Sequence, residues 1–83
     1  MRFHLNIYND VDTKDLDGLE LPDLAAAKDV AIDGARSMMA EHVRRGRPIS
    51  LHHRIEITDQ AGKVLATLPF RELITINDAI PDP

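Results

Sequence analysis

The longest regular pattern of hydrophobic and polar residues runs from Leu24 to Arg45 and is typical of an amphipathic helix. Projected at about 100° per residue, small and apolar residues collect on one side and most charged residues fall on the other. The pattern therefore predicts one long helix that packs along a single side. That side carries Leu24, Ala27, Ala31, Gly34, Ala35, Met38 and His42, with Val30, Ile32 and Met39 at its margins.

Both ends of this helix are marked in the sequence. Asp23 precedes it and offers a carboxylate that can accept a hydrogen bond from a first-turn N–H. Gly46 can take the left-handed conformation that follows many helices, and Pro48 prevents the helix from continuing. These signals predict a helix that begins just after Asp23 and ends just before Gly46.

Shorter stretches on both sides of the helix alternate between apolar and polar residues, as half-buried strands do. Gly18 lies within the second of them, where we expect a bulge or a sharp bend. The four predicted strands are residues 2–8, 15–21, 50–58 and 63–68.

The last two predicted strands are joined by Asp59–Gly62, a hairpin turn in which aspartate opens the turn and glycine supplies a positive φ. Pro69 is expected to stop the pairing of the last strand, and Phe70 to cap the core. Residues 71–76 fit either a helical turn or a short strand, and residues 77–83 are expected to fray. The sum is a single α+β domain, residues 1–83, with the order ββαββ: an antiparallel sheet with one long helix packed on one face.

Composition narrows the classes of protein. The chain has 83 residues and no cysteine, which excludes a disulfide framework, a thiolate zinc site and a cysteine nucleophile. No segment approaches the roughly 20 apolar residues that span a bilayer, and the N-terminus lacks the apolar run of a signal peptide. We therefore expect a soluble, cytoplasmic protein without membrane association. The net charge of −4 argues against general binding to nucleic acid.

Neither a metal nor a cofactor is expected. The stretch from Asp10 to Asp23 is acidic, but placing Gly18 at the sixth position of a calcium loop puts Thr13 first and Leu24 twelfth, so the ligand pattern fails. The histidines at positions 4, 42, 52 and 53 show no metal-ligand spacing.

No catalytic residue is predicted either, and we do not expect an enzyme. Ser37 lies within the helix and Ser50 near a strand, and no glycine-flanked nucleophile elbow surrounds either of them. The chain also lacks a glycine loop that could hold a phosphate group.

Two groups of residues remain as candidates for binding. The first is basic: the segment from His42 to Arg54 contains no acid, and Arg44, Arg45, Arg47 and Arg54 form a candidate anion-binding site. We favour a simpler interpretation, in which Arg44 and Arg45 complement the helix dipole and a polar loop follows the helix.

The second group of candidate residues follows from a comparison of the lengths of the predicted helix and strands. A helix of 22 residues is about 33 Å long, whereas strands of six or seven residues reach about 20–23 Å. The last turns, with Met38, Met39, His42 and Val43, are thus expected to overhang the sheet and to meet a partner. Alternatively, Leu73, Ile74 and Ile76 fold under this end of the helix. Both interpretations stay open.

Parts of the chain resemble a known family. The runs G-L-E-L-P-D-L (Gly18–Leu24) and R-I-E-I-T-D-Q-A-G-K-V-L-A-T-L-P-F (Arg54–Phe70) resemble a family of short bacterial proteins catalogued only as a domain of unknown function. The resemblance covers roughly Phe3 to Leu73. It supports the fold and implies no activity, and the chain departs from the family pattern in its polar tail and in the pair His52-His53.

The sequence thus predicts a small, non-enzymatic interaction module that binds a protein partner or forms a homodimer. The surface would be the Met38, Met39, His42 and Val43 end of the helix or an exposed strand edge. The alternative is a regulatory nucleic-acid-binding or anion-binding domain that uses the four arginines.

Overall fold

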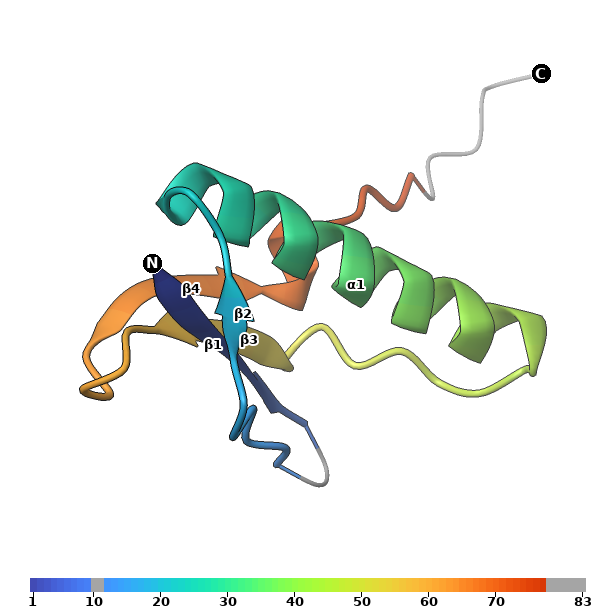
Figure 1. Ribbon diagram of the computed structural model, residues 1–83. Helices are drawn as coiled ribbons and strands as arrows, with labels where there is room; N and C mark the ends of the chain where they lie inside the picture. The colour runs from blue at the N-terminus through green and yellow to red at the C-terminus, as the bar shows by residue number, and fades with distance from the viewer. Residues whose placement is uncertain (10–11, 78–83) are drawn as a thin grey trace, which may run out of the picture.

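The computed structural model describes residues 1–9 and 12–77 as one antiparallel sheet covered by one long helix (Figure 1). The four strands have the spatial order β2-β1-β3-β4, and α1 lies across one face of the sheet. The α+β class and the ββαββ order predicted from the sequence are confirmed. The elements are β1 (Arg2–Tyr8), β2 (Leu19–Glu20), α1 (Leu24–Arg44), β3 (Arg54–Thr58), β4 (Val64–Pro69) and the short 3₁₀ helix η1 (Phe70–Glu72).

Helix α1 begins and ends where its sequence signals predict. The Asp23 carboxylate accepts a hydrogen bond from the Ala26 N–H at 2.8 Å and so satisfies one first-turn donor. Gly46 has a φ of 69°, and its N–H donates to the Val43 carbonyl at 3.1 Å. This left-handed residue ends the helix and turns the chain back toward the sheet.

The core lies between the sheet and one row of α1. Ala27, Ala31, Ala35 and Met39 form this row, and Met39 is only 4% exposed. Three alanines let the helix backbone lie close to the sheet, because their side chains are small. The rest of the core consists of Phe3, Ile55, Ile57, Phe70 and Leu73.

The buried row differs slightly from the predicted one. Gly34, predicted on the packed side, is exposed, and a Cβ placed on it would meet no atom within 4 Å other than its chain neighbours and the backbone of its own helix. Met39, predicted at the margin, is buried, whereas Met38 is half-buried. The reason is that the sheet contacts a row of residues four apart, which lies slightly to one side of the apolar stripe.

The second strand is shorter than predicted. Only Leu19–Glu20 pairs with β1, rather than residues 15–21. A carboxylate interrupts the ladder: Asp15 Oδ2 accepts a hydrogen bond from the Leu5 N–H at 3.2 Å, where a backbone carbonyl would otherwise stand. Gly18, with a φ of 75°, then bends the chain back into register, as expected.

Both predicted boundaries around β3 and β4 need correction. β3 begins at Arg54 rather than Ser50, since residues 50–53 form a turn in which the His53 N–H donates to the Ser50 carbonyl. Pro69 does not stop pairing but lies opposite Arg54 as the last residue of β4. Its nitrogen, which has no hydrogen, faces the open edge of the sheet, so no ladder bond is lost.

The hairpin turn and the core cap agree with the prediction. Asp59 Oδ1 accepts hydrogen bonds from the Ala61 and Lys63 N–H groups, and Gly62 has a φ of 86°. Phe70 is buried. Within residues 71–76, the first two belong to η1 and the others have no regular structure. The predicted fraying of the tail concerns residues that, apart from Asn77, lie outside the described range.

Candidate functional site

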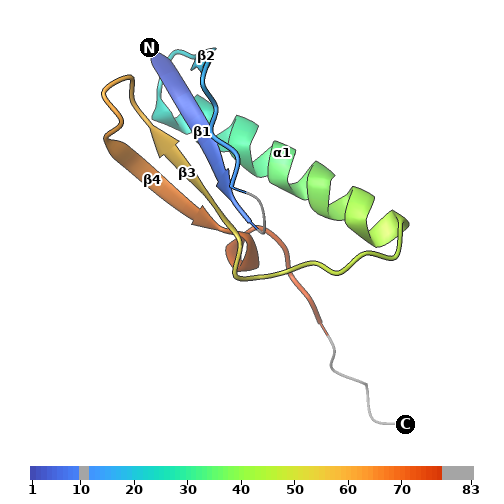
Figure 2. The same cartoon turned by 90° about the horizontal axis from the view of Figure 1, so that it is seen from below.

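Helix α1 extends beyond the end of the sheet. Its 21 residues span about 31 Å, whereas the seven residues of β1 reach about 23 Å. Figures 1 and 2 show the last turns of the helix beyond the strands, with the connector, residues 45–53, returning alongside them. The overhang predicted from these lengths is therefore present, and the connector faces it.

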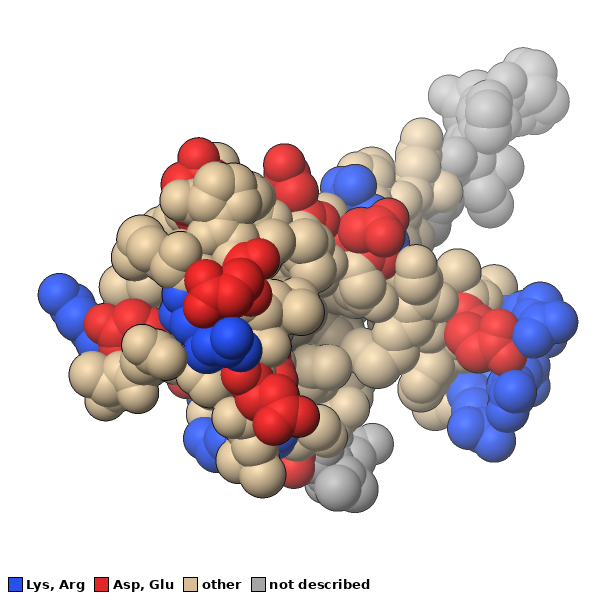
Figure 3. All heavy atoms as spheres, in the orientation of Figure 1, with Lys and Arg blue, Asp and Glu red and all other residues tan. Residues whose placement is uncertain are grey.

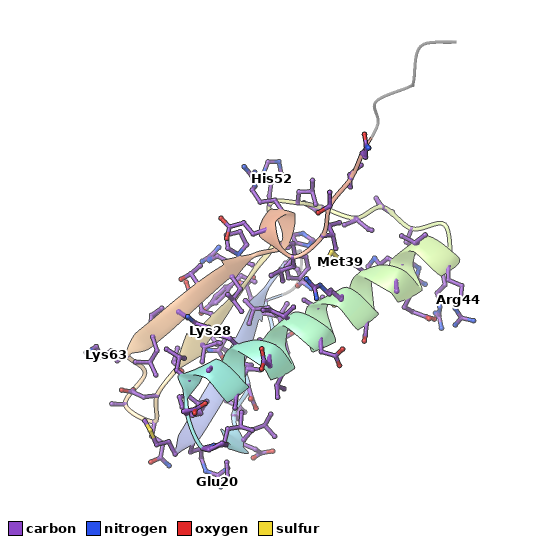
Figure 4. All side chains as sticks on the ribbon, turned by 90° about the horizontal axis from the view of Figure 1, so that it is seen from above. Glu20, Lys28, Met39, Arg44, His52 and Lys63 are labelled. Carbon is purple, nitrogen blue, oxygen red and sulfur yellow. The ribbon has the colours of Figure 1, made fainter. Side chains whose placement is uncertain are left out.

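A groove of about 350 Å³ lies between the overhanging part of α1, the connector and η1. We call it the helix-end groove. Its apolar lining comes from Met38, Met39, Pro48, Ile49 and Phe70, and its polar lining from Asn9, His42, Arg47, Ser50 and His53. Figure 4 shows Met39 on the side of α1 that faces η1 and the connector, whereas Arg44 points away from the protein.

Backbone and imidazole contacts hold the connector against the helix. The Arg47 N–H donates to the His42 carbonyl at 2.8 Å, and this bond spans more residues than the Gly46–Val43 bond at the same helix end. The His42 Nδ1 atom lies 3.3 Å from the Pro48 carbonyl oxygen. Two contacts from one helical residue thus set the distance between the two sides of the groove.

The other end of the groove is closed by two rings. His53 and Phe70 pack edge to face, with ring centroids 5.7 Å apart and an interplanar angle of 77°. The Phe70 N–H also donates to the His53 carbonyl at 2.9 Å. Because Phe70 is buried in the core, this wall of the groove is attached to the core of the domain.

The groove combines an apolar floor with positive charge at its rim. No aspartate or glutamate lines it among the described residues, whereas Arg47 and two histidines do. No carboxylate of the described residues pairs with Arg47. Such a surface suits a group that brings an apolar side chain and a negative charge together.

Of the four residues predicted to form the interaction surface, the groove takes in Met38, Met39 and His42. Val43 is exposed on the last turn and does not line the groove. Met39 is buried, so its role there is to form the floor. Ile49, His53 and Phe70 also form this surface, and their pattern in the sequence did not predict it. Ile49, flanked by Pro48 and Ser50 in an otherwise polar connector, is the signal that could have revealed them.

The C-terminal residues cover the middle of α1 rather than its overhanging end. Leu73 is buried, and its carbonyl accepts a hydrogen bond from Arg36 Nε at 2.7 Å. Ile74 is half-buried and Ile76 is exposed. The described residues fit part of each open interpretation. Leu73 packs under the helix, but the C-terminal residues up to Asn77 do not cover its overhanging end.

Three of the four predicted anion-binding arginines lie at the helix end, where Figure 3 shows positive charge gathered around an acidic residue. Arg44 and Arg45 both pair with Glu41, at 2.7 and 2.6 Å. Hydrogen bonds from Arg44 and then Arg45 lower the pKa of the Glu41 carboxyl below its usual value. The positive charges of Arg44 and Arg45 are thus partly neutralised, whereas Arg47 lines the groove.

The fourth arginine lies elsewhere. Arg54 belongs to β3, on the sheet face opposite α1, and its guanidinium stands over the Tyr8 ring, 4.4 Å from the centroid. Its Nε also lies 3.3 Å from a Glu56 carboxylate oxygen. Lys14 donates to the Tyr8 hydroxyl, which raises the pKa of the Lys14 ammonium group, and lies over the same ring. The structure therefore separates Arg54 from the other three arginines.

The acidic stretch before α1 has a structural role in the part of it that the structure describes, residues 12–23. The Asp15 carboxylate accepts hydrogen bonds from the Leu5 and Gly18 N–H groups, and the Asp15 N–H donates to the Asn6 side chain. Within residues 1–9 and 12–77, no group of three or more histidine, aspartate or glutamate side chains is placed to hold a metal ion. In the same part of the chain, no helix is both long and apolar enough to cross a membrane.

The fold and groove define a small α+β domain in which one helix covers a four-stranded antiparallel sheet and overhangs its end. The model of a domain of unknown function, DUF6894, matches residues 2–71, so the chain belongs to this family. This match confirms the resemblance seen in the sequence. Searches among curated proteins and among solved structures gave no match.

Proposed function

We propose that this domain is a cytoplasmic, non-enzymatic protein-interaction module. The helix-end groove is the observation that carries the proposal. It is a preformed concave surface with an apolar floor, and its walls are fixed to the core by Phe70 and to the helix by the His42–Pro48 contact. Interfaces gain most of their affinity from a few side chains that fill such pockets.

The occupant we propose is a segment of a partner protein that carries an apolar side chain next to a carboxylate. A methionine side chain adapts to apolar groups of different shapes, and Met38 lies half-buried at the floor of the groove. Arg47 at the rim can then form a charge-assisted hydrogen bond to the carboxylate. A groove of about 350 Å³ suits one or two side chains rather than a whole folded surface.

Self-association is the second part of the proposal. We propose that the domain forms a homodimer as well, because a chain of 83 residues buries a thin core and many such domains gain stability by association. The homodimer does not need the groove, so the two parts can be tested separately.

The alternative, a regulatory domain that binds nucleic acid or another anion through Arg44, Arg45, Arg47 and Arg54, has less support. Arg44 and Arg45 share one carboxylate, and Arg54 pairs with Glu56 on the sheet. A site for a phosphate backbone needs several arginines that are free to face it together.

Selection from a library of random peptides displayed on phage tests the groove. We expect enriched peptides to combine an apolar residue with aspartate or glutamate and to bind the wild-type domain. Met38→Glu places a charge in the groove and should abolish that binding. Ala40→Glu places the same charge on an exposed position of the same helix and should leave it unchanged.

Two results of this selection would contradict the proposal. One is the absence of any enrichment over a selection against the Met38→Glu domain. The other is a set of peptides that bind the wild-type and Met38→Glu domains equally well. In either case the groove does not form the binding surface.

A further inference from the structure

Leu16 is the most exposed large apolar residue of the part of the chain that the structure describes, at 86%. It lies in the segment that leads from β1 to β2, and we call residues 14–18 the Leu16 loop. One exposed leucine needs no explanation by itself. Leu16 differs because the backbone on both sides of it is fixed and because a carboxylate follows it directly.

Hydrogen bonds hold the Leu16 loop against β1. The Asp15 carboxylate accepts hydrogen bonds from the N–H of Gly18, at 3.0 Å, and from an N–H of β1, at 3.2 Å. On the other side of Leu16, the Asp17 carbonyl accepts a hydrogen bond from the Arg2 guanidinium at 2.7 Å. The loop therefore presents Leu16 to the solvent in a fixed position, so that binding this side chain costs little conformational entropy.

Asp17 places a negative charge next to Leu16. Among the described residues no cation pairs with the Asp17 carboxylate, since Arg2 pairs with Glu20 instead. The loop thus offers an apolar side chain followed directly by a carboxylate. This is the combination that suits the helix-end groove, which has an apolar floor, Arg47 at its rim and no acid among its described lining residues.

The Leu16 loop and the groove of one chain lie toward opposite ends of β3. Leu16 lines a hollow together with Thr58, the last residue of β3, and with Gly62 of the hairpin turn. The groove is lined by His53, which precedes β3, and by Asn9, which follows β1. Figure 1 shows the segment before β2 well apart from the last turns of α1. Because its hydrogen bonds hold the loop on β1, Leu16 does not reach the groove of its own chain.

We infer that the Leu16 loop of a second copy fills the helix-end groove. This inference rests on the proposed function and names a partner for the same groove. Self-association does not in itself require the groove, but this loop gives it a reason to use the groove. Leu16 of one copy packs against Met38 of the other, and the Asp17 carboxylate accepts a charge-assisted hydrogen bond from Arg47. Each copy offers one loop and one groove, so a dimer with two-fold symmetry contains the contact twice.

Light scattering behind a sizing column tests this contact in the full chain over a range of concentrations. We expect the wild type at twice the 9.3 kDa of one chain. Leu16→Asp removes the apolar side chain and Met38→Glu places a charge in the groove, so each variant should have the mass of a single chain. Val30→Asp places the same charge on another exposed apolar residue, on α1, and should remain a dimer.

A mixture of the two monomeric variants separates the loop from the groove. The Leu16→Asp domain keeps its groove and the Met38→Glu domain keeps its loop, so one of the two contacts can form between them. We expect a mass of two chains to reappear in the mixture at high concentration. The variant with both substitutions should stay at the mass of one chain, and circular dichroism shows whether each variant is folded.

A wild-type mass of one chain at every concentration would overturn the inference. A dimer that persists in the folded Leu16→Asp domain would overturn it too. Dissociation by Ile80→Ser but not by Leu16→Asp would assign the groove to the C-terminal segment, in which Ile80 also lies between two aspartates.

The peptide selection keeps this inference distinct from the proposed function. The Leu16→Asp domain has an intact groove and should still bind the selected peptides. Peptide binding without a Leu16-dependent dimer would overturn only this inference. Failure of the selection together with a monomeric wild type would overturn both.

Discussion

The imidazole of His42 and the carbonyl of Pro48 meet across the end of α1, with Nδ1 3.3 Å from the oxygen. His42 belongs to the last turns of the helix, and Pro48 belongs to the connector that leads back to the sheet. Their contact closes one end of the groove, while the His53–Phe70 pair closes the other. The groove is therefore built by contacts at both ends of a connector that has no regular structure of its own.

The two adjacent methionines should differ sharply in their effect on stability. Met39 is buried, so Met39→Ala leaves a cavity in the core and should reduce the free energy of unfolding by about 2–5 kcal/mol. Met38 is half-buried on the groove, so Met38→Ala should reduce it by about 1 kcal/mol. Urea denaturation followed by circular dichroism measures both values. Equal effects would show that Met39 is not the floor of the groove.

Two glycines should respond to alanine in opposite directions. Gly18 has a φ of 75°, and a Cβ there would lie 2.9 Å from the Phe3 carbonyl oxygen, so Gly18→Ala should destabilise the domain by about 1–3 kcal/mol. Gly34 lies on the exposed side of α1 with open space around it, so Gly34→Ala should stabilise by about 0.5–1 kcal/mol. Thermal unfolding of the two variants checks the signs. A neutral Gly18→Ala would contradict the close approach of this loop to β1.

The ion pairs at the helix end predict a pH dependence. Arg44 and Arg45 lower the pKa of Glu41 in the folded protein. Their stabilisation should therefore be fully present above the ordinary glutamate pKa of the unfolded chain and lost as the pH falls through the lower folded value. A titration of the Glu41 carboxyl carbon by NMR measures this pKa. Replacing both arginines by glutamine should return it toward its usual range, and an unchanged value would show that the pairs do not form in solution.

Binding to nucleic acid should be weak and insensitive to Arg54. Because Arg54 is engaged with Tyr8 and Glu56, Arg54→Gln should not change the affinity for a DNA duplex at low salt. Fluorescence anisotropy of a labelled duplex measures this at several salt concentrations. Tight binding that falls steeply with salt and weakens in Arg54→Gln would instead support the nucleic-acid-binding alternative.

Much of the fold could be predicted because local signals and tertiary packing agree. Asp23 and Gly46 fix the ends of α1 by hydrogen bonds within a few residues, and Asp59 with Gly62 fixes the hairpin in the same way. Two of the boundaries that were wrong depend on how residues distant in the sequence are placed. β2 is short because Asp15 bonds to Leu5, and Pro69 pairs because its nitrogen faces the open edge.

The candidate site could be predicted only in part. Helix and strand lengths indicate an overhang, and this locates Met38, Met39 and His42. The opposite wall could not be predicted, because Ile49 and His53 reach the groove only through the path of the connector. The four arginines also appeared as one group in the sequence, but Arg54 lies on a strand that carries it to the other face of the sheet.

The chain itself supplies a direct probe of the groove. It has three methionines, of which Met38 and Met39 line the groove and Met1 lies exposed at the N-terminus. Methyl resonances of methionine labelled with ¹³C can therefore be followed while a selected apolar, acidic peptide is added. Met1 serves as the internal control for non-specific effects.

In this titration we predict that the Met38 and Met39 methyl resonances shift and saturate together, while the Met1 resonance stays in place. The same peptide should produce no shift in the Met38→Glu domain at the remaining Met39 methyl. Binding of the peptide without any change at Met38 and Met39, or with a change at Met1 alone, would contradict the claim that the helix-end groove holds the partner.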